Sequence, residues 1–226
     1  RIQGITSLLY TGIDNITVKS NLIEPYGTAA GSYGDRNAVS INYGGTTNYR
    51  TASGGVDNIL YQDNTVALGA SSGFRAAIAI DEGNASITGN IATTINHDVL
   101  VRFSSGAVTV TGNTCYGGGM EFSDFNLGTG TLTISNNTFD GTIGNTYTNA
   151  LRLKNNYTAR TTIVSNNTFT HFVGNIAGYG GTVSLENYQA ITLDGNTFTP
   201  LANSTTFRHI TINTKDFSSS SGHYTP

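Results

Sequence analysis

The residues of this chain that could do chemistry are charged side chains that recur at matching positions of short alternating segments. Charged residues make up only 11% of the 226 residues. The segments are 39–42, 78–81, 101–104, 120–123, 151–154 and 183–186. Their apolar residues alternate, which predicts strands whose remaining side chains share the outer face. One outward row then reads Ser40, Ala79, Arg102, Glu121, Arg152, Ser184, and a second reads Asn42, Asp81, Ser104, Ser123, Lys154, Glu186.

Two explanations fit the charged strip formed by Arg102, Glu121 and Arg152, which we expect to be neighbours on successive strands. The first is an ion-pair ladder that sets strand register and contributes about 0–1 kcal/mol per exposed pair. The second is a groove that binds or cleaves a glycan, where a carboxylate acts as acid or base and a basic side chain holds an anionic sugar. Such a groove would use Glu121 or Asp81 as the catalytic acid or base, with Arg102 positioning the substrate.

Candidate ligand-binding side chains come from these outward rows and from tyrosines in the connecting loops. The candidates are Arg102, Glu121, Arg152, Lys154, Glu186, Tyr43, Tyr49 and Tyr179. Aromatic rings that stack on sugar faces are a common means of binding polysaccharide. Tyrosines equally often cover the edges of stacked coils, so both roles remain open at this point.

The elements that position these residues belong to a repeat that runs through most of the chain. Its clearest copy is residues 130–141, GTLTISNNTFDG, where apolar and polar residues alternate up to an Asn-Asn-Thr corner. Such corner asparagines recur at spacings of 43, 26, 23, 24, 30 and 29 residues, at Asn21, Asn64, Asn90, Asn113, Asn137, Asn167 and Asn196. These spacings are typical of solenoid coils, which bury their apolar faces only by stacking. A last strand at 210–213 keeps the alternation of this repeat but lacks its corner.

Three columns of like residues predict that the coils stack in register. Three residues before the asparagine stand Val18, Tyr61, Ile87, Val110, Ile134, Val164 and Leu193. Two residues after it stand Ile23, Val66, Ala92, Cys115, Phe139, Phe169 and Phe198. The asparagines form the third column, and we expect their amides to bond from coil to coil while their backbone adopts the left-handed conformation of a tight corner. The lone cysteine, Cys115, is then a core residue.

The composition argues against several classes of function. Apolar residues make up 37% of the chain and recur periodically, which argues against disorder, and no apolar run is long enough to span a membrane. The net charge of −3, without any Lys-Arg cluster, argues against a nucleic-acid partner. His97, His171, His209 and His223 are dispersed and lack the paired spacing of a metal site. We therefore expect no metal site, no nucleic-acid partner and no membrane insertion.

The repeated phrase, as in residues 110–114, 134–139 and 193–198, resembles the coil motif of right-handed parallel β-helices of the pectate-lyase-like superfamily. The resemblance covers nearly the whole chain. It implies an all-β fold, a right-handed single-stranded parallel β-helix of about seven coils, over residues 1–215. Residues 216–226 are interpreted as a tail or linker. That superfamily includes polysaccharide lyases, glycoside hydrolases, phage tailspikes and bacterial surface adhesins, so the fold alone does not determine the chemistry.

The function that the resemblance implies first is attachment to cell-surface or extracellular polysaccharide, as in tailspikes or adhesins. Such a protein would be extracellular, on a cell surface or in a virion, and a homotrimer about the long axis would suit a tailspike. The alternative is a polysaccharide lyase or glycoside hydrolase acting on such a glycan. A second alternative is a structural stalk that binds no ligand.

The enzymatic members of the superfamily differ from this chain in their acidic residues. Pectate lyases gather several carboxylates on one strand face around calcium, whereas Asp81, Glu121 and Glu186 are spread over non-adjacent coils. The Asn-x-Asp and Asp-Asp pairs of polygalacturonase-type hydrolases have no evident counterpart. We therefore expect no cofactor, with calcium the one ion that the resemblance leaves open.

Overall fold

The computed structural model of this chain describes residues 15–24, 37–41, 58–69, 76–81, 83–94, 97–102, 106–123, 130–142, 149–156, 161–172, 182–188, 190–200, 209–215 and 224–225. Every helix or strand assigned within these ranges is a strand, as the alternating pattern predicted. Within the same ranges, no helix is long and apolar enough to cross a membrane.

The strands form three sheets, named A, B and C here. Sheet A contains β1 (Thr17–Lys19), β4 (Ile59–Gln62), β7 (Ala85–Thr88), β10 (Val108–Thr111), β13 (Leu132–Ser135), β16 (Thr162–Ser165) and β19 (Ile191–Asp194). Sheet B contains β2 (Leu22–Ile23), β5 (Thr65–Gly69), β8 (Ile91–Thr94), β11 (Thr114–Tyr116), β14 (Thr138–Asp140), β17 (Thr168–Thr170) and β20 (Thr197–Thr199). Sheet C contains β3 (Asn37–Ile41), β6 (Ala76–Asp81), β9 (His97–Arg102), β12 (Gly119–Ser123), β15 (Leu151–Asn156), β18 (Val183–Tyr188), β21 (Ile210–Lys215) and β22 (Tyr224–Thr225).

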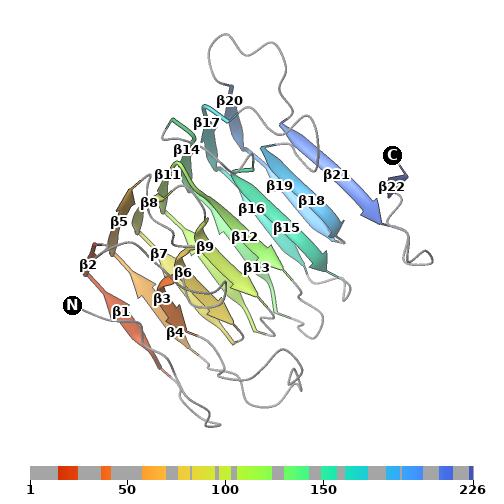
Figure 1. Cartoon of the computed structure of the whole chain (residues 1–226). Helices are drawn as coiled ribbons and strands as arrows, with labels where there is room; N and C mark the ends of the chain where they lie inside the picture. The colour runs from red at the N-terminus through yellow and green to blue at the C-terminus, as the bar shows by residue number, and fades with distance from the viewer. Residues whose placement is uncertain are drawn as a thin grey trace.

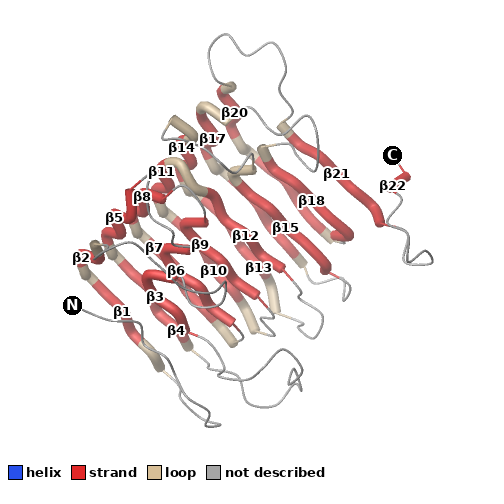
Figure 2. Tube along the Cα trace, viewed as in Figure 1, coloured by secondary structure: helices blue, strands red, loops and turns tan. Residues whose placement is uncertain are grey.

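The chain visits sheets A, B and C in turn and then returns to sheet A one strand further along. Figure 1 shows the resulting stack, in which strand colours run in order from one end to the other, and Figure 2 shows that the described residues between strands are short turns. Neighbouring strands pair in parallel throughout, except β22, which pairs antiparallel with β21. Three parallel sheets built from successive turns fit a β-helix solenoid.

The register confirms the three predicted columns. In sheet A, Val110 lies opposite Ile87 on one side and Ile134 on the other, and the same column continues to Leu193. In sheet B, Phe139 lies between Cys115 and Phe169. The sequence did not predict sheet B as a separate sheet, because its strands after the corner are too short to show a period of two.

The corner asparagines form a continuous hydrogen-bond ladder. In each step the backbone N–H and the Nδ2 of one asparagine both donate to the Oδ1 of the next, at 2.9–3.0 Å, from Asn21 through to Asn196. From Asn64 onward, each Nδ2 also donates to a strand carbonyl of the preceding turn, such as Val110 for Asn137. The interior amides are therefore buried but fully partnered, which makes their burial favourable.

The left-handed residue of each corner is the one before the ladder asparagine, which corrects the expectation that the asparagine itself adopts this backbone. The residues at this position have φ between 52° and 67°, and they are Ser20, Asp63, Gly89, Gly112, Asn136, Asn166 and Gly195. The ladder asparagine instead keeps a negative φ, because its backbone N–H and side chain must both reach the same oxygen of the next coil.

Gly112 isolates the cost of this left-handed corner. A Cβ added there would have only Gly89 N within 4 Å, at 3.9 Å, so Gly112→Ala introduces no clash. Because an L-residue with a Cβ disfavours φ of 67°, we expect a loss of about 1–2 kcal/mol in unfolding free energy, measured by urea denaturation. The control is Gly112→Asn, since asparagine tolerates this region better, and an equal loss in both variants would contradict the backbone explanation.

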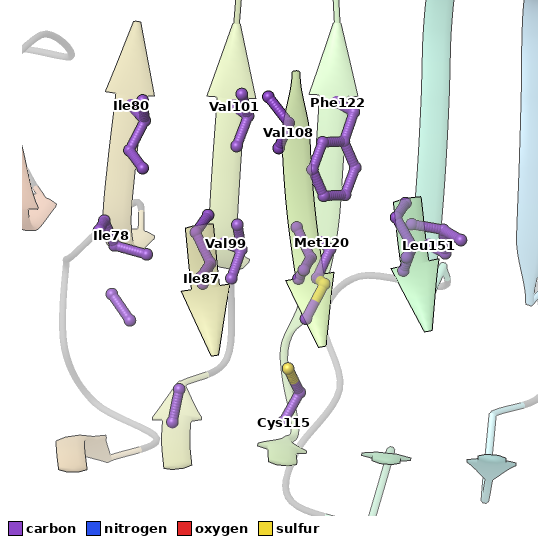
Figure 3. Packing of buried hydrophobic residues seen from close by; sticks show 14 of the residues in the cluster. Ile78, Ile80, Ile87, Val99, Val101, Val108, Cys115, Met120, Phe122 and Leu151 are labelled. Atoms are coloured by element: carbon purple, nitrogen blue, oxygen red, sulfur yellow. The ribbon is translucent and has the colours of Figure 1, made fainter. Parts of the chain in front are cut away.

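The core is a layered interior between the sheets. Figure 3 shows Ile78, Val99 and Met120 of sheet C in one row at the level of Ile87 of sheet A, with Cys115 of sheet B pointing toward Met120. A second row of sheet C, Ile80, Val101 and Phe122, lies at the level of Val108 of sheet A. Cys115 is a buried residue of the core, as predicted. Farther along sheet B, Phe139, Phe169 and Phe198 stack with ring centroids 4.7 and 4.9 Å apart.

The end of the chain differs from the sequence-based assignment. The strand expected at 210–213 was grouped with the corner repeat, but β21 pairs with β18 in sheet C, which explains why it lacks a corner. Of the expected tail at 216–226, only Tyr224 and Thr225 are among the described residues, and they pair antiparallel with β21.

Candidate functional site

Four charged side chains meet on the outer face of sheet C, on the three neighbouring strands β12, β15 and β18. Arg152 Nε and Nη2 donate to the two carboxylate oxygens of Glu186 at 2.6 and 3.0 Å. Lys154 Nζ lies 2.8 Å from Glu121 Oε1, and Arg152 Nη1 lies 3.5 Å from Glu121 Oε2. We call these four residues the charge cluster.

The charge cluster forms because parallel register brings alternate residues of adjacent strands to one face. Glu121 lies directly opposite Arg152, and Lys154 lies directly opposite Glu186. The two closest contacts run diagonally, from Arg152 to Glu186 and from Lys154 to Glu121, because long side chains reach two residues along the neighbouring strand. Each carboxylate therefore has a cation within 3 Å.

The acidic members of the charge cluster lie deeper than the basic members. The side chain of Glu121 is 6% exposed and that of Glu186 is 13% exposed, against 27% for Arg152 and 21% for Lys154. Ser184, in the same outward row as Glu121, is also buried. Burying the carboxylate of Glu121 is tolerable because two cations compensate for its lost hydration.

Arg102 does not belong to the row of Glu121, which corrects the predicted strip. The register places Leu100, not Arg102, opposite Glu121, and it places Arg102 between Asp81 and Ser123. The prediction shifted strand β9 by two residues, because Val99, Val101 and Phe103 are all apolar, so a shift of two residues leaves the alternating pattern unchanged. The inner columns are filled by Val99 and Val101, which are both buried.

The sequence-predicted candidates therefore separate into three groups. Glu121, Arg152, Lys154 and Glu186 are in direct contact. Asp81 and Arg102 are register partners on β6 and β9, in the same outward row as Lys154 but separated from it by Ser123 on β12. The candidate tyrosines, Tyr43, Tyr49 and Tyr179, lie outside the described residues.

A second polar group, which the sequence analysis did not predict, lies at the C-terminal ends of strands β14 and β17 of sheet B. His171 Nδ1 lies 2.8 Å from Asp140 Oδ1, which also accepts hydrogen bonds from the backbone N–H and the hydroxyl of Thr142. Partial burial raises the pKa of Asp140, but the hydrogen bonds from Thr142 and His171 outweigh it and hold the pKa below its usual value. His171 has φ of 63°, an uncommon backbone for a residue other than glycine.

A tyrosine lies beside this group. Tyr116 is the register partner of Asp140 on the neighbouring strand, and it is 37% exposed. The signal that could have found this group is positional, because Tyr116, Asp140 and Thr170 each stand three residues after a ladder asparagine. Tyr116 is thus an exposed aromatic side chain that a ligand could reach, and it is the last residue of strand β11 rather than part of a long loop.

Asp140 carries a prediction on pH dependence. We expect Asp140→Asn to lower the unfolding free energy by about 1 kcal/mol at pH 7, because a neutral amide accepts these hydrogen bonds more weakly. A folded-state pKa below the unfolded value of about 3.9 stabilises the protein above that pH, and the contribution disappears as pH falls through the folded value. Urea titrations at pH 7 and pH 3 should therefore show the difference shrinking.

The control for this prediction is Asp194→Asn, since Asp194 is exposed and its side chain has no hydrogen-bond partner among the described residues. It should change the unfolding free energy less than Asp140→Asn at pH 7. A loss in Asp140→Asn that is equally large at pH 3 would show that the charge of Asp140 is not responsible.

Neither group has the composition of a metal centre. Among the described residues, no three histidine, cysteine or acidic side chains come together in a way that could hold a metal ion. The chemistry that the charge cluster can offer is recognition of anionic groups by Arg152 and Lys154.

No protein-family model, no curated protein and no solved structure matches the chain.

Proposed function

We propose that this protein attaches to cell-surface or extracellular polysaccharide through the outer face of sheet C. The observation that carries the proposal is the depth order of the charge cluster, in which Arg152 and Lys154 are more exposed than Glu121 and Glu186. An incoming ligand would meet the cations first. Carboxylate or sulfate groups of an acidic polysaccharide match that order, because a planar guanidinium binds such anions in a defined geometry.

The carboxylates beneath give the cations a second role. Glu186 holds the guanidinium of Arg152 through two hydrogen bonds, so the side chain is oriented before a ligand arrives. Preorganisation of this kind reduces the conformational entropy lost on binding. Neighbouring strands of sheet C lie about 4.8 Å apart, so the charge cluster extends across three strands, which suits an extended polymer better than a small ligand.

Catalysis by the charge cluster is less well supported. Glu121, the leading acid or base candidate, has a side chain that is 6% exposed and bridged by Lys154 at 2.8 Å. A glycosidic oxygen could reach it only after Lys154 had moved. The alternative of a structural stalk that binds no ligand is supported by the charge cluster too, since ion pairs that satisfy one another need no ligand to explain them.

One experiment separates the three functions. A glycan array of acidic and neutral polysaccharides identifies binding, and incubation of each hit with the protein tests for reducing ends or unsaturated products. We expect binding to acidic glycans without turnover. Turnover that disappears in Glu121→Gln would support the enzyme, and no binding to any glycan would support the stalk.

The residue-level test uses one lysine against another. Lys154→Gln should weaken binding to the array hit at least about tenfold, as expected for the loss of a charge-assisted contact. Lys19→Gln is the matched control, because Lys19 is an exposed lysine on β1 of sheet A, away from the charge cluster. Both variants should keep the far-ultraviolet circular dichroism of the parent, and equal weakening in both would contradict a site on sheet C.

The same proposal covers the finer architecture and the setting. We propose a right-handed winding, because parallel strand connections are right-handed in the great majority of proteins. We also propose about seven coils, one for each ladder asparagine, and membership of the pectate-lyase-like superfamily on the strength of the coil phrase. A polysaccharide-binding protein of this type would act outside the cell or in a virion, with a homotrimer as the assembly to test by sedimentation.

A further inference from the structure

The outer face of sheet B carries an exposed aromatic side chain beside the pair of Asp140 and His171. The row three residues after each ladder asparagine holds Thr93, Tyr116, Asp140, Thr170 and Thr199 on successive strands. Tyr116 is 37% exposed, and the neighbouring strands form the same sheet with a threonine or an aspartate at its position. The fold therefore does not require an aromatic ring here.

His171 occupies a position at which the two preceding coils use glycine. Gly117, Gly141 and His171 each stand four residues after a ladder asparagine. Gly117 has φ of 83° and His171 has φ of 63°, a region of backbone conformation that favours glycine. A Cβ added at Gly141 would lie 2.9 Å from the carbonyl oxygen of His171, so these two turns pack backbone against backbone. A histidine in such a strained position is better explained by its side chain than by the needs of the turn.

The hydrogen bonds of this group decide which polar atoms are left for a ligand. Asp140 Oδ1 accepts hydrogen bonds from Thr142 and lies 2.8 Å from His171 Nδ1. Because a carboxylate only accepts, Nδ1 carries the proton, and Nε2 of the neutral imidazole is then an acceptor. His171 Nε2, Asp140 Oδ2 and the hydroxyl of Tyr116 make no hydrogen bond to another described residue. The side chains of His171 and Asp140 are 38% and 24% exposed, so a ligand can reach these atoms.

We propose that Tyr116, Asp140 and His171 form a binding site for a neutral sugar residue. The ring of Tyr116 stacks on the apolar face of the sugar, while Asp140 Oδ2 and His171 Nε2 accept hydrogen bonds from its hydroxyl groups. Asp140 lies on β14 between the other two, because β14 pairs with β11 on one side and with β17 on the other. The three side chains therefore extend over about 10 Å, or two strand spacings.

The free atoms of this site select the class of ligand. Hydrogen bonds hold the pKa of Asp140 below its usual value, so the carboxylate is ionised at neutral pH and repels an anionic group. The acidic sugars proposed for the charge cluster are therefore excluded, whereas sugar hydroxyls supply the donors that two acceptors need. A small organic cation fits less well, because cation sites of this kind surround the ligand with several aromatic rings.

The test titrates the full chain into fluorescently labelled neutral oligosaccharides of glucose, galactose and mannose. We expect saturable anisotropy for at least one of the three, and a chemical-shift change at His171 Nε2 on binding. Tyr116→Ala should weaken this binding at least about tenfold, because the stacking surface is lost. Tyr116→Phe is the matched control, since it keeps the ring, and its affinity should stay within about threefold of the parent.

His171→Gly separates a binding role from a structural one. Glycine adopts φ of 63° freely, so the variant should keep the circular dichroism of the parent. Its affinity for the neutral oligosaccharide should nevertheless fall at least about fivefold, because one acceptor is lost and Asp140 is no longer held. A histidine needed only for the turn would not affect sugar binding when glycine replaces it.

Four outcomes would overturn the proposal. The first two are the absence of saturable binding to all three oligosaccharides and equal affinity in Tyr116→Ala and the parent. Unchanged affinity in folded His171→Gly would remove the histidine from the site. Binding of tetramethylammonium that depends on Tyr116, without sugar binding, would identify a cation site instead. Acidic glycans are tested separately with Lys154→Gln on sheet C, so this proposal and the proposed function can each fail without the other.

Discussion

Asn137→Ala is expected to lower the unfolding free energy by about 3–5 kcal/mol, more than we expect for Gly112→Ala at a corner of the same ladder. The amide of Asn137 donates to Val110 O and to Asn167 Oδ1, and its Oδ1 accepts two hydrogen bonds from Asn113. Alanine removes all of these side-chain bonds at once. The buried donors of Asn113 are then unsatisfied, and desolvated polar groups of this kind cost about 1–3 kcal/mol each.

The measurement is equilibrium urea unfolding, with circular dichroism as the probe. Asn136→Gly is the matched control, because Asn136 is the adjacent asparagine of the same corner but is exposed and has φ of 56°. Glycine adopts this backbone freely, so the control should change stability by less than about 0.5 kcal/mol. A loss of less than 1 kcal/mol in Asn137→Ala would show that the ladder is not a main source of stability.

Phe169→Ala is expected, as a single substitution, to lower the unfolding free energy by about 3–5 kcal/mol. The ring of Phe169 is fully buried and stacks between Phe139 at 4.7 Å and Phe198 at 4.9 Å. Replacing it with alanine leaves a cavity between two rings whose backbones are held apart by the sheet B register. The coils cannot collapse into that space without breaking strand pairing, so little of the lost packing is recovered.

The comparison for this prediction lies in the same column. Phe198→Ala removes the same ring from the last strand of sheet B, where the side chain is only partly buried. Its cost should be smaller than that of Phe169→Ala, because the ring has one stacked phenylalanine neighbour instead of two and its other ring neighbour, His209, is tilted at 5.1 Å. Equal losses in the two variants would indicate that the exposed end contributes as much as the interior, contrary to the layered core.

The columns could be predicted from the sequence because they depend on local spacing. The apolar residue three positions before each asparagine and the residue two positions after it are set by strand period and corner length. Seven copies of the phrase then specify which residues lie opposite one another, as at Val110, Ile134 and Val164. The hydrogen-bonded ladder of asparagines followed from the same alignment.

Sheet C was harder to predict because no corner residue marks its start. The segments before it differ in length, and Val99, Val101 and Phe103 alternate, so the pattern is unchanged by a shift of two residues. Only pairing with both neighbouring strands selects the frame that places Arg102 beside Asp81 and Ser123. The predicted contact of Arg102 with Glu121 was wrong for that reason.

The charge cluster was likewise predictable only in part. Outward alternation brought Glu121, Arg152, Lys154 and Glu186 onto one face, but their diagonal contacts and their order of depth depend on side-chain length and on burial. The pair of Asp140 and His171 was not predicted, because the two residues are 31 positions apart and occupy different places in the repeat.

The sequence by itself therefore determined the repeat, the apolar and phenylalanine columns and the asparagine ladder, because each follows from a fixed number of residues within one coil. Only the tertiary structure decided the register of sheet C, which residue of each corner is left-handed, and which charged groups touch. The physical reason is that hydrogen bonds and ion pairs between coils require their donor and acceptor atoms to lie about 3 Å apart. Loops of unequal length hide those distances from any pattern that is read along the chain.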